Sequence, residues 1–340
     1  MNSNRLKENN LPLLLKPEDL YKFFNIDFNS LIKLSVIKNE ISPKEFLYRR
    51  YKIKKKGSGY RQIVAPKKEL KRIQSIIFKS ILELREPSRF AYGFRKGYSI
   101  VSNAKIHLNS EIIYNIDLKD FFTSIKFDKV QAVFRTLGYS ESVSLLLTKL
   151  CTITPRYYSK SRKAWVIYKE RLPHLPQGAS TSPILSNLVC IEFDKGLYEI
   201  AKKFSLRFTR YADDITFSSM VNKKIPKDFR NEVFRYIRKS GYRVNTRKER
   251  YSRNFKQRKV TGVIVHKEEL TLPRSWIRNL RAALYQLRHL YSRLKFAGTD
   301  DLLKNIEGRC SYAMMVNKEK YAHFYQEFLY LKNFKFKNKP

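Results

Sequence analysis

Apolar residues recur every three or four positions in several stretches of the chain, which is the spacing of an amphipathic helix. This spacing predicts short helices within residues 11–50 and longer helices at 67–86, around 127–150, at 181–204 and at 227–240. The clearest apolar face is that of the second stretch. It consists of Leu70, Ile73, Ile77, Ile81 and Leu84.

The helix expected at 181–204 carries a start signal of its own. The hydroxyl of Ser182 can accept a hydrogen bond from the first turn, and Pro183 follows at a position where proline is tolerated. The sequence therefore predicts that this helix is capped by Ser182.

Alternating apolar and polar residues, the pattern of a half-buried strand, mark other stretches. Residues 112–118 (IIYNIDL) and 259–265 (KVTGVIV) are each predicted to be one strand. Residues 206–219 (LRFTRYADDITFSS) alternate on both sides of a turn, and 51–66 have β character on each side of Gly57-Ser58-Gly59, which predicts a hairpin. Strands and helices in this order predict an α+β fold with an antiparallel sheet.

The chain is predicted to be helical from residue 273 onward, with two contrasting faces at 274–294. The basic face consists of Arg274, Arg278, Arg281 and Arg288. The apolar face consists of Trp276, Leu280, Leu284, Leu287, Tyr291 and Leu294. The arginines can form a solvated surface or a contact surface for nucleic acid, and the pattern leaves both interpretations open.

Charge favours a polyanionic partner. The 340 residues include 70 Lys and Arg against 30 Asp and Glu, a formal net charge of +40. Such a field attracts polyanions, and nucleic acid releases counterions when many cations contact its phosphates. An anionic membrane surface is the second candidate. The 22 Tyr and 23 Phe supply rings that can stack on bases, although core packing explains most rings equally well.

Cysteine and histidine usage argues against disulfides and against a zinc site. Cys151, Cys190 and Cys310 are far apart, and the five histidines are scattered. The first residues, MNSNRLKENN, have no apolar core of a signal peptide, and no stretch is apolar for the length of a membrane span. We therefore expect a cytoplasmic protein without a membrane partner.

Two adjacent carboxylates, Asp213 and Asp214, occupy the predicted turn of this basic chain. Asp117 ends the strand 112–118 and Asp120 follows it, so neighbouring strands would bring Asp117 close to Asp213. An Asp-Asp turn alone is more often structural. Three carboxylates together are suited to Mg²⁺, and two such ions can clamp the attacking and leaving oxygens of a phosphoryl transfer.

Three motifs in order, NIDLKDFF (115–122), LPQGASTSP (175–183) and YADD (211–214), resemble the palm motifs of reverse transcriptases. YRQIVAP (60–66) resembles a fingers strand of that family, and GYRVNTRKER (241–250) resembles its fourth palm motif. The resemblance extends over roughly residues 50–330 and includes KVTGVIV as the primer-gripping strand. It implies a right-hand polymerase with N-terminal helices and fingers at 1–110, a palm with an excursion at 152–172 within 111–270, and a basic helical thumb at 271–340.

Two further patterns resemble the retron branch of that family, namely Asn103-Ala104-x-x-His107 and Val260-Thr261-Gly262. This resemblance implies an RNA-directed DNA polymerase that copies a dedicated structured non-coding RNA into multicopy single-stranded DNA, starting from an RNA 2′-OH. It also implies deoxynucleotide substrates and an effector protein in an antiphage defence system. Group II intron-like or diversity-generating reverse transcriptases, and an inactive RNA-binding scaffold, remain alternatives.

The resemblance also implies roles for single residues. Asp117 and Asp213 would hold two Mg²⁺ ions with support from Asp214, and Lys248 would protonate the departing pyrophosphate unless it is a surface lysine. Phe122 would exclude a ribose 2′-OH, or else belong to the core. The nucleotide site would comprise Lys55, Arg61, Leu118, Asp120, Phe121, Phe122, Gln177 and Gly178.

RNA and primer contacts are expected from residues of three regions. They are Arg95, Asn103, His107, Val260, Thr261, Gly262, Arg274, Arg278, Arg281 and Arg288. Asn103 and His107 could equally form a buried hydrogen-bonding pair, and Thr261-Gly262 could mark a bulge. Residues 152–172 are polar, aromatic and basic, and either RNA or an effector protein could bind them.

Overall fold

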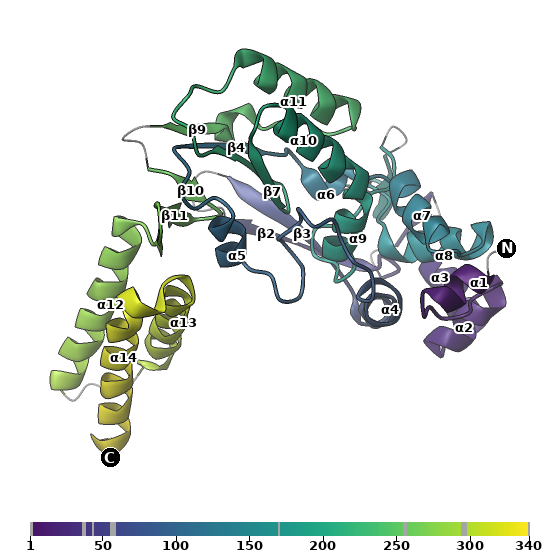
Figure 1. Ribbon diagram of the computed structural model, residues 1–340. Coiled ribbons are helices and arrows are strands. Elements are labelled where there is room, and N and C mark those ends of the chain that lie inside the picture. Colours follow the sequence, from purple (N-terminus) through teal and green to yellow (C-terminus); the bar gives the residue numbers. More distant parts are fainter. Residues whose placement is uncertain are drawn as a thin grey trace. The chain divides into compact units, whose positions relative to one another are not determined.

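The computed structural model describes residues 3–35, 39–42, 44–54, 59–168, 171–253, 257–293 and 298–338. They divide into two compact units that interleave along the chain. The first unit comprises Met1–Arg95, Leu118–Ile200 and Arg230–Asn245, and the second comprises Lys96–Asp117, Ala201–Phe229 and Thr246–Pro340. Most elements of both are labelled in Figure 1.

Helices dominate the first unit, together with two small sheets. Its helices are α1 (Ser3–Glu8), α2 (Pro17–Phe24), α3 (Phe28–Ser35), α4 (Lys68–Ile77), η1 (Phe78–Leu82), α6 (Phe121–Ser124), α7 (Phe127–Thr136), α8 (Glu141–Cys151), α9 (Ser182–Val189) and most of α10 (Ile191–Lys203) and α11 (Lys227–Lys239). Its strands are β1 (Glu40–Ile41), β2 (Tyr48–Lys54), β3 (Tyr60–Pro66), β5 (Arg156–Ser159) and β6 (Ala164–Ile167).

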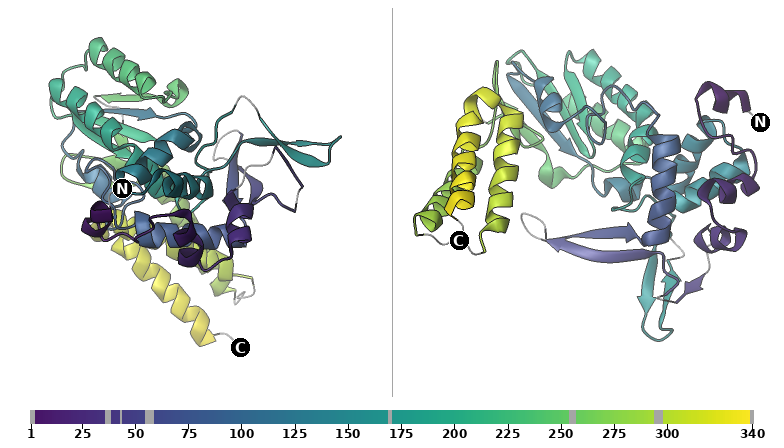
Figure 2. Two further views of the ribbon diagram at one scale, coloured as in Figure 1. Left: turned by 90° about the vertical axis from the view of Figure 1, so that its right-hand side faces the viewer. Right: turned by 90° about the horizontal axis from the view of Figure 1, so that it is seen from below.

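The predicted hairpin at 51–66 is confirmed, because β2 and β3 pair antiparallel over Tyr48–Lys54 and Tyr60–Pro66. A second hairpin, β5–β6, is extended by β1 into a three-stranded sheet. Figure 2 shows both hairpins as long projecting ribbons of their unit, β2–β3 in blue and β5–β6 in teal. The excursion at 152–172 is therefore built largely as this second hairpin.

Two predicted helices are each divided in two. The stretch around 127–150 forms α7 and α8, because Gly138 adopts a left-handed φ of 109° and Ser140 then caps α8. The stretch 181–204 forms α9 and α10, which are separated at Cys190. The expected cap is also wrong: Thr181 precedes α9, and the Ser182 hydroxyl donates a hydrogen bond to the Pro176 carbonyl oxygen instead.

An antiparallel sheet forms the centre of the second unit, in the strand order β7-β8-β4-β9. The predicted strands at 112–118 and 206–219 are confirmed as β4 (Ile112–Asp117), β7 (Arg207–Tyr211) and β8 (Asp214–Ser219), and β9 (Arg250–Arg253) pairs with the other edge of β4. The antiparallel α+β architecture predicted from the sequence is therefore present.

The remaining prediction for a strand, 259–265, is wrong. Val260 pairs with Val263, so β10 (Lys259–Val260) and β11 (Val263–Val265) form a tight hairpin. Its two loop residues, Thr261 and Gly262, have φ of 46° and 93°, the left-handed values that a two-residue hairpin turn requires. The alternation of apolar and polar residues does not reveal that the chain turns back at Thr261 and Gly262.

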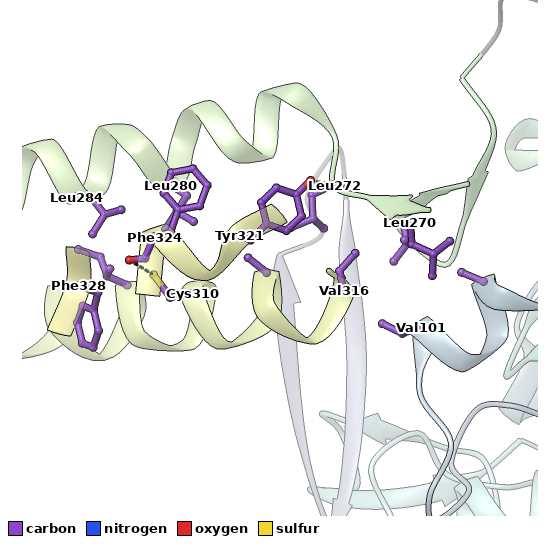
Figure 3. Packing of buried hydrophobic residues seen from close by; sticks show 14 of the residues in the cluster. Val101, Leu270, Leu272, Leu280, Leu284, Cys310, Val316, Tyr321, Phe324 and Phe328 are labelled. Atoms are coloured by element: carbon purple, nitrogen blue, oxygen red, sulfur yellow. Dashed lines mark hydrogen bonds between the residues drawn. The ribbon is translucent and has the colours of Figure 1, made fainter. Parts of the chain in front are cut away.

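Three helices complete the second unit: α12 (Arg274–Ser292), α13 (Asp300–Val316) and α14 (Lys318–Asn338). They pack with α5 (Ile100–Lys105) and with β10, β11 and β12 (Leu270–Thr271) around one apolar core. Figure 3 shows Leu280 and Leu284 of α12 facing Phe324 and Phe328 of α14 in this core. The predicted apolar face of α12 is confirmed for Leu280, Leu284, Leu287 and Tyr291, whereas Leu294 lies outside the described residues.

No helix among the described residues is both long and apolar enough to cross a membrane.

Candidate functional site

A carboxylate pair faces across two neighbouring strands of the second unit. Asp117 is the last residue of β4, and its register partner is Asp214, the first residue of β8. Tyr211 pairs with Asp214 to close the turn, so Ala212 and Asp213 form a two-residue loop. All three predicted carboxylates are therefore brought to one end of the sheet.

The turn that carries Asp213 has a strained backbone at Ala212, which a buried arginine holds by a hydrogen bond. Ala212 has a φ of 56°, a left-handed conformation that residues with a Cβ rarely adopt. The fully buried guanidinium of Arg210 donates a hydrogen bond to the Ala212 carbonyl oxygen at 3.2 Å. Sequence reasoning missed Arg210, although an arginine at an inward position of a strand beside the Asp-Asp turn is a detectable signal.

Lys248 lies at the carboxylate cluster. It ends η2 (Thr246–Lys248), and its Nζ donates a hydrogen bond to Oδ2 of Asp117 at 2.8 Å. The Asp117 side chain is 8% exposed, whereas that of Lys248 is 57% exposed, so the lysine approaches the acid from the solvent side. The contact makes Lys248 part of the cluster rather than an isolated surface lysine.

The charges within this cluster influence the pKa values of Asp214 and Lys248. Desolvation by the surrounding protein, and then the charges of Asp213 and Asp117, raise the pKa of Asp214, while Lys248 and Arg250 oppose the shift. Water screens part of this effect, because Asp214 retains an exposed surface. Partial burial acts to lower the pKa of Lys248, but its hydrogen bond to Asp117 and the nearby carboxylates raise it overall.

The donor chemistry of this cluster fits Mg²⁺, which prefers carboxylate oxygens. Among the residues that the structure describes, no three Asp, Glu, His or Cys side chains are already arranged to hold a metal ion. Asp117 is instead engaged by Lys248. The cluster therefore brings suitable metal ligands close together, but their side chains do not form a complete coordination shell among the described residues.

His107 is buried behind the sheet, not on the surface. Its Nδ1 and Nε2 lie 2.7 Å and 2.8 Å from the hydroxyl oxygens of Ser218 and Thr209, on β8 and β7. Burial, and then the charge of Arg207, lower the pKa of His107 to about 3, so the ring is neutral at pH 7. His107 is thus buried and hydrogen-bonded, as one of the two interpretations left open by the sequence expected, but its partners are Ser218 and Thr209 rather than Asn103.

Asn103, on α5, is also buried, being 1% exposed. Neither its amide nitrogen nor its amide oxygen makes a hydrogen bond to the described residues, so it forms no pair with His107. The nearby loop residue Thr261 donates from Oγ1 to the carbonyl oxygen of Ile100, which ties the β10–β11 turn to α5. Gly262 completes that turn after the buried Val260.

Within the first unit, the strand that carries Arg61 touches the segment that carries Gln177 and Gly178. The amide nitrogen of Val64, on β3, donates to the carbonyl oxygen of Gln177 at 2.8 Å. A Cβ on Gly178, whose φ is 135°, would lie 2.9 Å from Cγ2 of Ile63. Glycine is thus required for this close approach. Arg61 is exposed on the same strand, and Lys55 lies outside the described residues.

The segment after Asp117 also belongs to the first unit. Leu118 is buried and pairs with Val244, and Phe121 is buried against Tyr242. Asp120 is exposed with a φ of 53°, and its carbonyl oxygen accepts from the Ser124 amide. Phe122 is half-buried, with its ring centroid 6.1 Å from that of Phe94. An accessible ring at this position is compatible with either a nucleotide contact or packing.

The predicted RNA-binding arginines differ in their present contacts. Arg95 donates to Glu86 at 2.6 Å in the first unit. In the second unit Arg288 pairs with Glu327 at 2.7 Å, and Arg281 lies over the Phe324 ring. The predicted basic face is exposed along α12. Its members are Arg274, Arg278, Arg281 and Arg288.

Comparison with known proteins gives consistent sequence matches. Residues 53–265 match the family described as reverse transcriptase (RNA-dependent DNA polymerase). The chain is 33% identical over 321 residues to the retron Ec86 reverse transcriptase of Escherichia coli, covering 94% of this chain and 90% of that protein. It is 32% identical over 288 residues to the retron Mx162 reverse transcriptase of Myxococcus xanthus, covering 80% and 58% respectively.

Solved structures give a weaker likeness. A telomerase from Candida albicans in complex with a fragment of telomeric RNA aligns with a TM-score of 0.49 at 12% identity, over 94% of this chain and 64% of that chain. A similarity of this strength adds nothing to what the sequence matches establish.

Substituting Gly178→Ala should destabilise the fold by about 1–3 kcal/mol, because the new Cβ would meet Ile63 and the backbone is left-handed. Chemical denaturation measures the change. Gly97→Ala is the matched control: its φ is also positive, at 77°, but no atom lies within 4 Å of the new Cβ. Equal losses in both variants would show that the approach to β3 is unimportant.

His107 should make stability fall with acidification. Its folded pKa of about 3 lies below the unfolded value of about 6.5, so the unfolded state binds the extra proton between these pH values. The wild-type protein should therefore lose about 2 kcal/mol more than His107→Gln between pH 7 and pH 5. Denaturant titrations at both pH values measure this, and parallel losses in the two proteins would contradict it.

Proposed function

The chain belongs to the reverse transcriptase family and to its retron members, and we propose that it copies a dedicated structured RNA into multicopy single-stranded DNA. As a member of this family it is an RNA-directed DNA polymerase with a right-hand α+β fold, and its template is RNA. We further propose that a 2′-OH of the same RNA serves as the primer and that the enzyme acts in antiphage defence with an effector protein.

The observation that carries a catalytic role, as opposed to an inactive scaffold, is the intact carboxylate cluster at the end of β4 and β8. Asp117 and Asp213 would hold two Mg²⁺ ions, and Asp214 would supply a supporting charge. Bound there, the ions would activate the attacking hydroxyl and neutralise charge on the departing pyrophosphate. The short two-residue turn keeps Asp213 and Asp214 next to the end of β4.

Lys248 would donate its Nζ proton to the departing pyrophosphate. The neighbouring carboxylates raise its pKa and so keep it protonated at neutral pH. Its exposed side chain leaves it accessible from solvent, and its hydrogen bond to Asp117 shows that it reaches the cluster. During the reaction this proton would pass from nitrogen to a phosphate oxygen.

Nucleotide selection is assigned to the first unit. Phe122 would lie under the sugar and exclude a 2′-OH, while Gln177 and Gly178 would support the new base pair. The planar guanidinium of Arg61 suits bidentate contact with a triphosphate. Leu118 and Phe121, being buried, would act by positioning the segment between Asp117 and Phe122.

We further propose three functional parts, namely N-terminal helices and fingers at 1–110, a palm at 111–270 and a basic helical thumb at 271–340. The exposed arginines of α12 would contact RNA or primer phosphates from the thumb. With a net charge of +40, affinity for RNA should depend strongly on salt. Asn103 and His107 would influence RNA only indirectly, because both are buried.

The decisive experiment is purification from the native host followed by sequencing of the associated nucleic acid. An RNA joined to DNA through a 2′ linkage would support the proposal. Intron RNA, or complementary DNA of a variable repeat, would instead indicate one of the other bacterial reverse transcriptases, and the absence of any DNA product would favour the inactive scaffold.

Asp213→Asn should abolish DNA synthesis while leaving the fold and RNA binding intact. Removing one carboxylate charge from the metal site should lower the rate of DNA synthesis about 100-fold or more, because the metal ions would lose a ligand. Each tenfold loss in rate corresponds to about 1.4 kcal/mol in the activation barrier. Primer extension measures the loss. Asp301→Asn, in the first turn of α13, is the matched control. Full-length product from the Asp213 variant would count against the metal assignment.

Phe122→Ala should relax sugar selection. Without the ring, a ribose 2′-OH meets no obstruction, and discrimination against ribonucleotides should fall about tenfold or more. Single-nucleotide extension with paired deoxy and ribo substrates measures the ratio. Phe122→Tyr keeps the bulk and should keep the selectivity; unchanged selectivity in the alanine variant would refute the steric role.

A further inference from the structure

The β5–β6 hairpin of the first unit has two unlike faces, which its register defines. Tyr157 pairs with Val166, and Tyr158 pairs with Trp165. Because side chains alternate along a strand, Tyr157 and Tyr168 lie on one face, while Tyr158 and Trp165 lie on the other. Figure 2 shows the hairpin, in teal, projecting from its unit.

The face with Trp165 packs against other residues of the first unit. The Trp165 ring stacks on Phe46 at 4.7 Å, and the Arg50 guanidinium lies 4.5 Å from its centroid. Arg156 is buried and donates to the carbonyl oxygens of Asn39 and Trp165. These contacts and the pairing of β1 with β6 hold the hairpin in a defined orientation.

The opposite face presents two neighbouring, mutually tilted rings and a cation to solvent. Tyr157 and Tyr168 are 40% and 38% exposed, and their ring centroids are 5.0 Å apart. The guanidinium of Arg171 lies 4.6 Å from the Tyr168 ring centroid. Exposed rings on a fixed support cost little to order on binding, which is the property of a stacking platform for bases.

The positive charge of the hairpin favours a polyanionic partner. Residues 156–168 contain four basic residues and no Asp or Glu. Lys160 and Lys163 are exposed at the tip, while Arg162 pairs with Glu40. A nucleic acid offers phosphates to these two exposed lysines and base faces to the tyrosines, a combination that a protein surface would have to supply with acidic and aromatic side chains together.

From this arrangement we infer that the Tyr157–Tyr168–Arg171 face of the β5–β6 hairpin binds an unpaired segment of RNA. The bases stack on the two rings, and the lysines at the tip contact the adjoining phosphates. The inference rests on the proposed function only in requiring RNA as a partner. It assigns residues 152–172 to RNA and not to an effector protein.

The test uses the full-length protein and a 12-nucleotide single-stranded RNA carrying 4-thiouridine. Crosslinks mapped by mass spectrometry should include the peptides that contain Tyr157 or Tyr168. Tyr157→Ala combined with Tyr168→Ala should remove these crosslinks and weaken binding of the RNA about tenfold. Tyr157→Phe combined with Tyr168→Phe should keep both, because stacking does not need the hydroxyl groups.

Two further variants distinguish the platform from general damage. Tyr158→Ala, on the same strand but the opposite face, should retain the crosslinks. Lys160→Ala combined with Lys163→Ala should reduce the slope of log affinity against log salt by about 1.4, the value for two phosphate contacts on a single strand. Thermal denaturation of each variant reports on folding.

Crosslinks confined to other peptides, together with wild-type affinity in the double alanine variant, would overturn the inference and leave the face to a protein partner. Extension of a DNA primer on an unstructured RNA template by the wild-type protein tests the proposed function separately. That extension can succeed while the platform fails, so the two outcomes are distinguishable.

Discussion

The antiparallel register between β4 and β8 is the constraint on which the site depends, because it places Asp117 opposite Asp214. A slip of one residue would turn every side chain of the strand to the other face. The register is secured by packing on both faces of β4, because Ile112, Ile113, Ile116 and Ile215 are almost completely buried and a slip would force all of them to repack. It is also secured by β9, which pairs with the other edge of β4.

Polar groups are brought into the interior to hold this arrangement. Arg210 is buried beneath the strained Ala212, and His107 is buried as a neutral ring between two hydroxyls. Each group has hydrogen-bond partners, which offset the cost of desolvation. Lys248 then balances part of the negative charge that the turn concentrates. The carboxylate cluster of a strongly basic chain is thus built by its sheet and by the cations that support it.

The regular parts of the second unit and the identity of the carboxylates could be predicted from the amino-acid pattern alone. The strands 112–118 and 206–219 are predictable from the local sequence because they are enriched in β-branched and aromatic residues. The structure nevertheless buries nearly every side chain of β4, not every second one. The basic and apolar faces of α12 follow from helical spacing. The motif around Asp213 and Asp214 was recognisable because its residues are adjacent in the chain.

The positions at which the chain reverses, and the polar groups that are buried, follow from the three-dimensional fold and not from the local pattern. Left-handed backbone at Gly138 and at Thr261-Gly262 breaks patterns that look continuous in apolar spacing. Ser182, expected as a cap, is turned toward Pro176, and His107 finds its partners more than 100 residues away. Spacing reports only on a residue's own segment, whereas caps, turns and buried hydrogen bonds depend on distant segments that the fold brings together.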